Sequence, residues 1–212
     1  MTLIRIKQQY VTSAMRAIVL TLSLATAALP ALALLAPQTA LAASARPENS
    51  AELVAGSILS NIGHGTWIVE GRSPHVIYIF FDPNCPYCHQ LYEDLRPWVK
   101  RNRVQLRWLP VGVLTATSRG KAAAILGAKN RLAAFRLNER GFSRAAGFGR
   151  IPEEPLPKPA ILKDLRANEA LLQRTGQESV PAMVFRLRDG TPIVVQGAPP
   201  PRVLKTIVDQ LQ

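Results

Sequence analysis

The chain has 212 residues, of which 48% are hydrophobic, and it carries a formal net charge of +12. This length fits one globular domain preceded by a targeting segment. The basic residues are scattered and have no interleaved aromatic residues of the kind that stack on bases, which argues against nucleic-acid binding. Two cysteines are too few for a structural disulfide framework, and their close spacing points to chemistry instead.

The N-terminus has the pattern of a signal peptide. Basic residues precede an apolar run over 17–35, and small residues follow at 40–44. This order predicts export by a signal peptide over 1–42, for which Met15 would be a more typical start than Met1. An uncleaved membrane anchor is the alternative, because the apolar run approaches the roughly 20 residues that span a bilayer. In both cases the rest of the chain lies in an oxidising compartment.

The first half of the chain predicts a strand–helix–strand unit. The strand before the helix, over 75–81, is a continuous apolar run, which is typical of a central strand buried on both faces. Pro97 lies inside the helix that follows and should kink or locally break it. We expect a tether over 43–65 that contains a short helix at 51–62. Two strands (66–70 and 75–81), a helix (85–100) and a third strand (104–113) follow in chain order.

The second half predicts helices first and a hairpin later. The dipeptide Asp189-Gly190 is a turn signal between two apolar segments. We expect one or two helices over 117–137, then a Gly- and Pro-rich loop over 141–159 and a helix over 160–175. Two strands (182–187 and 193–196) and a closing helix (201–211) complete the chain.

These elements describe an α/β fold with a mixed central sheet flanked by helices. A βαβ half is joined to a ββα half by a helical insertion over about 117–159. We expect one catalytic domain over 66–212.

The strongest chemical signal is Cys85-Pro86-Tyr87-Cys88 at the start of the predicted helix. Unpaired N–H groups and the helix dipole lower the pKa of a cysteine placed there, and the thiolate is the form that attacks disulfides. Pro86 suits the first helical turn because its missing N–H costs no hydrogen bond. We expect Cys85 to be the exposed nucleophile and Cys88 the shielded resolving thiol. Tyr87 and a protonated His89 would tune the thiolate.

Two other chemistries use the same residues. Zinc would need two more ligands, and the chain has no further cysteine and only three histidines. Residues 85–89 also spell Cys-x-x-Cys-His, the attachment motif of c-type haem. The motif follows a buried strand, however, and the available axial ligands are poor, since Met183 lies in a predicted strand. We expect neither a metal nor a haem.

The segment from Phe80 to Cys88 resembles the active site of the periplasmic disulfide isomerases DsbG and DsbC, with the closer likeness to DsbG. The resemblance covers 66–212 and continues through four further segments, at 96–99, 104–107, 111–113 and 122–126. It implies a thioredoxin fold and a redox-active Cys85–Cys88 disulfide with no other cofactor. It also implies a periplasmic thiol–disulfide oxidoreductase or isomerase that acts on exported proteins containing cysteines, with a membrane redox partner such as a DsbD-like reductase or an oxidase.

The resemblance also assigns a role to Val180-Pro181. In the family a cis-proline loop at this position lies beside the cysteines and binds the client through its backbone. Without the resemblance a trans bond would be expected, since only about 5–6% of X-Pro bonds are cis.

One departure from the family concerns the N-terminus. DsbG and DsbC carry an N-terminal dimerisation domain, whereas about 30 residues separate the expected cleavage site from the first core strand. We therefore expect a monomer with weakened isomerase activity. The alternative function is a non-catalytic thioredoxin-fold chaperone or assembly factor of a secretion or conjugation system.

Overall fold

A mixed five-stranded sheet forms the centre of the computed structural model, which describes residues 50–211. The strands are β1 (Ile68–Glu70), β2 (Val76–Phe81), β3 (Gln105–Pro110), β4 (Ala182–Arg186) and β5 (Pro192–Gln196). Their order across the sheet is β1-β3-β2-β4-β5. β2 and β3 run parallel, and the other neighbouring pairs run antiparallel.

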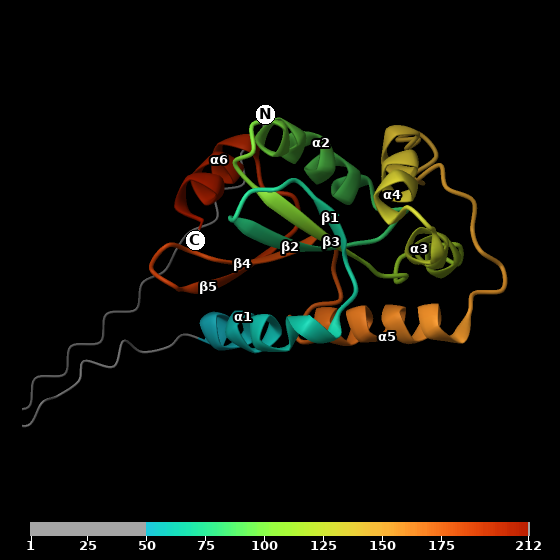
Figure 1. Cartoon of the computed structure of the whole chain (residues 1–212), viewed down its shortest axis with the longest axis horizontal. Coiled ribbons are helices and arrows are strands. Elements are labelled where there is room, and N and C mark those ends of the chain that lie inside the picture. The colour runs from blue at the N-terminus through green and yellow to red at the C-terminus, as the bar shows by residue number, and fades with distance from the viewer. Residues whose placement is uncertain (1–49, 212) are drawn as a thin grey trace, which may run out of the picture. The chain divides into compact units, whose positions relative to one another are not determined.

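Helices cover both faces of the sheet (Figure 1). They are α1 (Ser50–Asn61), a 3-10 turn (Ile62–His64), α2 (Pro86–Lys100), α3 (Ser118–Gly127), α4 (Arg131–Arg140), α5 (Pro159–Gln173) and α6 (Pro201–Gln210). α1 and α5 lie along one face, and α2 and α6 lie along the other. α3 and α4 stand together beyond one end of the sheet.

β2 is the central strand because its sequence is apolar on both faces. Ile77, Ile79 and Phe80 are fully buried, and β3 and β4 flank the strand on either side. A strand with both faces covered by helices needs such a continuous apolar run. The C-terminal end of β2 leads directly into the cysteines, so a buried central strand carries the candidate site.

Aromatic side chains join the helical insertion to the core. Phe135 of α4 is fully buried, and its ring centroid lies 5.0 Å from Phe81, 5.4 Å from Tyr92 and 5.0 Å from Trp108. Edge-to-face and tilted rings at these distances add to the free energy of apolar burial. One ring from the insertion therefore contacts β2, α2 and β3 together.

The predicted order of strands and helices is confirmed, with two differences. The helix is not broken at Pro97 but continues to Lys100. A proline lacks an N–H and so removes one hydrogen bond of the helix. Pro97 lies in the last turn of α2, and the Pro97 carbonyl still accepts a hydrogen bond from the Arg101 N–H. β3 ends at Pro110, short of Val113. Of the one or two helices expected over 117–137, two form, α3 and α4.

Several expectations lie outside the described residues. They are the signal peptide or anchor over 1–42, the choice between Met1 and Met15, and the start of the tether at 43. Within residues 50–211, no helix is both long and apolar enough to cross a membrane.

Replacing Phe135 with alanine should destabilise the protein by about 3–5 kcal/mol, because it leaves a cavity between α4 and the sheet. Leu137→Ala on the same helix is the control, since Leu137 is 44% exposed and should change stability by less than about 0.5 kcal/mol. Urea denaturation of both variants measures the difference. Equal effects would mean that α4 does not depend on this ring.

Candidate active site

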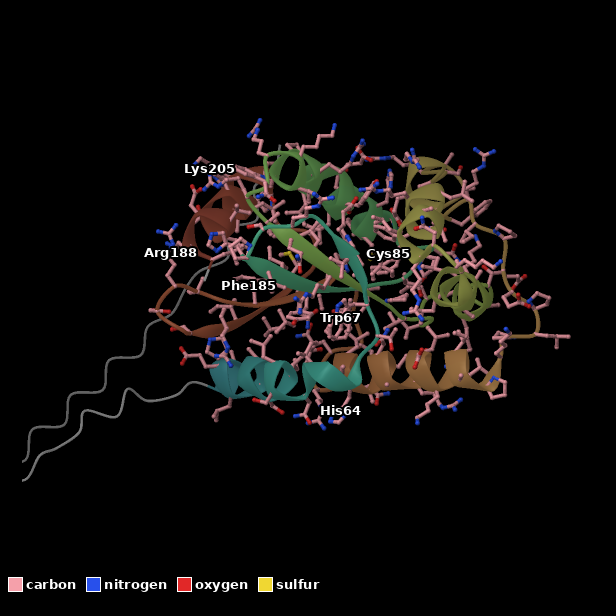
Figure 2. All side chains as sticks on the ribbon, viewed as in Figure 1. His64, Trp67, Cys85, Phe185, Arg188 and Lys205 are labelled. Carbon is pink, nitrogen blue, oxygen red and sulfur yellow. A yellow bond between two sulfur atoms is a disulfide. The ribbon has the colours of Figure 1, made fainter. Side chains whose placement is uncertain are left out.

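Cys85 and Cys88 form a disulfide at the N-terminus of α2 (Figure 2). Cys85 is the N-cap residue, and its Sγ accepts a hydrogen bond of 3.0 Å from the Cys88 N–H. Pro86 occupies the first helical turn, as expected. Main-chain N–H groups at a helix start favour negative charge, so this sulfur is the one placed to carry a thiolate after reduction.

Cys85 is less exposed than expected. Both cysteines are only 2% exposed, so the prediction of an exposed Cys85 is wrong for the disulfide form. The Val180-Pro181 bond is cis, and the Val180 carbonyl oxygen lies 3.6 Å from Cys85 Sγ. This loop comes from a segment 95 residues later in the chain, which is why local sequence gave no sign that it covers the sulfur.

The turn before the cysteines is held by the buried carboxylate of Asp82. Oδ1 accepts from the Asn84 N–H at 2.9 Å and from the Ser118 hydroxyl at 2.7 Å. Oδ2 accepts from the Val113 and Leu114 N–H groups at 2.9 and 3.0 Å. The Asp82 carbonyl also accepts from the Cys85 N–H at 3.0 Å. One side chain thus joins the active-site turn to the loop between β3 and α3.

Asn84 extends this network into α3. Its amide donates to the hydroxyls of Thr115 and Thr117, and its oxygen accepts from Lys121 Nζ at 2.9 Å. Lys121 also donates to the Gly149 carbonyl at 2.8 Å. Burial lowers the pKa of Lys121, an effect that Glu153 and Asp82 oppose.

The loop after α4 reaches the same turn. The Gly149 N–H and the Asn138 amide both donate to the Pro83 carbonyl, at 3.1 and 3.0 Å. A Cβ at position 149 would collide with the Asn138 amide, so the close approach requires glycine. The insertion therefore supports the turn from two sides, through α3 and through the end of α4.

His89 faces the insertion. Its Nδ1 lies 3.1 Å from Oε2 of Glu139, and its ring stacks on Phe142 with centroids 4.7 Å apart. Burial raises the pKa of Glu139, while hydrogen bonds from His89 and Asn138 act in the opposite direction. Tyr87 is 68% exposed.

The structure thus brings together Cys85, Cys88 and Val180-Pro181, as expected. Sequence reasoning missed five side chains that support them: Asp82, Asn84, Lys121, Asn138 and Glu139. Asp82 and Asn84 could have been found, since polar residues directly after a buried strand and before a helix often make local hydrogen bonds. The other three carry no local signal.

Residues 66–212 match the family of the thioredoxin-like domain. The chain belongs to the thioredoxin-like family. This match spans the same residues as the expected catalytic domain. The expected thioredoxin fold is confirmed.

Two thioredoxin-like relatives are thiol:disulfide interchange proteins DsbG. The one from Pseudomonas aeruginosa is 36% identical over 144 residues, which cover 67% of this chain and 55% of that protein. The one from Escherichia coli is 32% identical over 144 residues, covering 67% and 56%. The resemblance to DsbG is confirmed, and the chain spans about half the length of these relatives.

Among solved structures, the catalytic domain of Proteus mirabilis ScsC is similar in fold to this thioredoxin-like chain. It superposes with a TM-score of 0.60 at 19% identity, covering 74% of this chain and 96% of that domain. Within the part of the chain that the structure describes, no three histidine, cysteine or acidic side chains gather in a way that could hold a metal ion.

Asp82→Ala should lower the free energy of unfolding by at least about 2 kcal/mol, because it leaves buried N–H donors without an acceptor. It should also speed hydrogen exchange at the Val113 and Leu114 amides. Asp164→Ala on α5 is the control, for which stability within about 0.5 kcal/mol of the wild type is expected. Unchanged exchange at both amides would show that Asp82 does not hold this loop.

Proposed function

We propose that the protein is a thiol–disulfide oxidoreductase that exchanges disulfides with exported client proteins through Cys85 and Cys88. The observation that carries this proposal is the disulfide at a helix N-terminus, beneath the cis Val180-Pro181 loop, in a thioredoxin-like fold. The similarity to DsbG over 67% of the chain supports it.

The exchange has two steps. In the reduced protein the Cys85 thiolate attacks a client disulfide, forming a mixed disulfide and releasing one client thiolate, which takes up a proton. Cys88 then loses its proton and attacks Cys85 Sγ, which restores the Cys85–Cys88 bond and releases the second client thiolate. Two electrons pass to the client. Reversing both steps oxidises a client dithiol.

Cys85 is suited to be the attacking sulfur because it caps α2. The Cys88 N–H, 3.0 Å away, would stabilise its negative charge. Cys88 lies one turn further into the helix, with Cα atoms 5.1 Å apart, within reach for the second step. The backbone of Val180 and Pro181, next to Cys85 Sγ, would bind the extended client segment around its cysteine.

The expected surroundings are the periplasm and a membrane redox partner. Support comes from the signal-peptide pattern over 1–42 and from the paired cysteines, which need an external electron donor or acceptor to turn over. We place the catalytic domain at 66–212 and its helical insertion at about 117–159. Thiol trapping in cells decides the direction of the reaction, because an isomerase or reductase is kept reduced and an oxidase is kept as the disulfide.

Cys88→Ser should accumulate mixed disulfides with client proteins, since the resolving thiol is lost while the attacking one remains. Cys85→Ser and the double variant should form none, and both should lose disulfide exchange with a model client. Non-reducing gels and mass spectrometry measure the adducts. A Cys85→Ser strain with full cellular function would contradict the proposal and support the non-catalytic chaperone or assembly factor.

A further inference from the structure

A cavity of about 230 Å³ lies between α2, α4 and β1, and none of the steps above uses it. Its polar and charged lining residues are Glu70 of β1, Tyr92, Arg96 and Lys100 of α2, and Arg136 and Arg140 of α4. Neither cysteine lines it, and neither does the Val180-Pro181 loop. The cavity is therefore separate from the redox site, at the place where the helical insertion meets α2 and the edge strand β1.

Positive charge exceeds negative charge around this cavity. Four cationic side chains line it, against a single carboxylate, Glu70. That carboxylate is already engaged, because Oε1 accepts from Arg136 Nε at 2.9 Å and Oε2 accepts from the Trp108 indole N–H at 3.2 Å. Arg96 pairs with Glu93 at 3.0 Å. Four cations and two carboxylates leave a formal charge of +2, so the cavity favours an anionic ligand.

Two of the cations have hydrogen-bond donors to spare. Arg140 donates only through Nε, to the Arg136 carbonyl at 3.2 Å, and its two terminal nitrogens bond to no residue in 50–211. Within the same described range, Lys100 forms no hydrogen bond and no ion pair. Both residues are exposed, so a ligand from solution can reach them.

Tyr92 adds a donor that is buried in the protein. The residue is 2% exposed, and its ring packs against Phe135 and Trp108 with centroids 5.4 and 6.0 Å away. Its hydroxyl makes no hydrogen bond to any other residue that the structure describes. Burial and then the Glu70 charge raise the pKa of Tyr92, against an opposing effect of Arg96, so the hydroxyl keeps its proton. A buried hydroxyl without a partner costs free energy, which an acceptor bound in the cavity would recover.

We propose that this cavity binds a phosphate group, either free phosphate or the headgroup phosphate of an anionic lipid. Arg140 and Lys100 would bind its oxygens through their free N–H groups, and the Tyr92 hydroxyl would donate to a further oxygen. A phosphate has more acceptor oxygens than a carboxylate, so it can satisfy donors from two helices at once. Arginine suits this ligand because its planar fork of N–H groups matches two phosphate oxygens. The proposal does not depend on the chemistry of the cysteines.

Isothermal titration calorimetry of the purified protein with inorganic phosphate tests the proposal. We expect saturable binding that Arg140→Gln and Tyr92→Phe each weaken about tenfold, because each removes a donor to a charged acceptor. Tyr92→Phe keeps the ring, so the packing on Phe135 is retained. Arg166→Gln on α5 is the matched control, because it removes an exposed arginine on the opposite face of the sheet and should weaken binding less than about twofold.

Vesicles distinguish the two sources of the phosphate. If the ligand is a lipid headgroup, the protein should sediment with phosphatidylglycerol vesicles, and Arg140→Gln should abolish this while Arg166→Gln should not. A protein that binds inorganic phosphate as expected but sediments with neither phosphatidylglycerol nor phosphatidylcholine vesicles uses free phosphate. Binding that Arg140→Gln weakens no more than Arg166→Gln does would reflect net charge alone and would overturn the proposal. A protein that binds neither inorganic phosphate nor phosphatidylglycerol vesicles would overturn it as well.

Discussion

The buried carboxylate of Asp82 is the interaction on which the site depends. Its side chain accepts four hydrogen bonds, from the active-site turn, from the loop after β3 and from the start of α3. A buried acceptor with this many donors ties its surroundings to one arrangement, because each lost bond leaves a polar group unsatisfied. These four hydrogen bonds fix the end of β2 relative to the helical insertion, and none of them involves a cysteine. The helix that begins at Cys85 inherits that position.

The helical insertion is part of the site. Lys121 and Asn138 bond to the turn at Asn84 and Pro83, and Glu139 bonds to His89. Phe135 anchors the same segment in the core. The position of the disulfide at a helix N-terminus follows from local sequence. The side chains that support the turn before it come from the insertion, which follows β3. Changes in this segment can therefore alter the surroundings of the pair while the Cys-x-x-Cys motif stays the same.

The fold could be predicted because its signals are local. The apolar run of β2, the periodicity of the helices and the turn at Asp189-Gly190 each act over a few residues, and the strands and helices follow one another in the expected order. The helix is not broken at Pro97, because a missing N–H in the last turn of a helix removes only one hydrogen bond. The cis bond before Pro181 was expected only through the resemblance to DsbG and DsbC, since the dipeptide itself favours trans.

Sequence alone established that two cysteines one helical turn apart follow a buried strand, and that this pair is the chemical centre of the chain. The motif by itself is compatible with redox chemistry, a metal or a haem, and the buried strand before it, the helix start and the export signal favour redox chemistry. Tertiary structure decided what surrounds the sulfurs: the Val180 carbonyl that covers Cys85, and the Glu139 carboxylate that faces His89. These partners lie 95 and 50 residues away from the residues they contact. No helical or strand period links residues so far apart, so only packing of the insertion and of the cis-proline loop onto α2 brings them together.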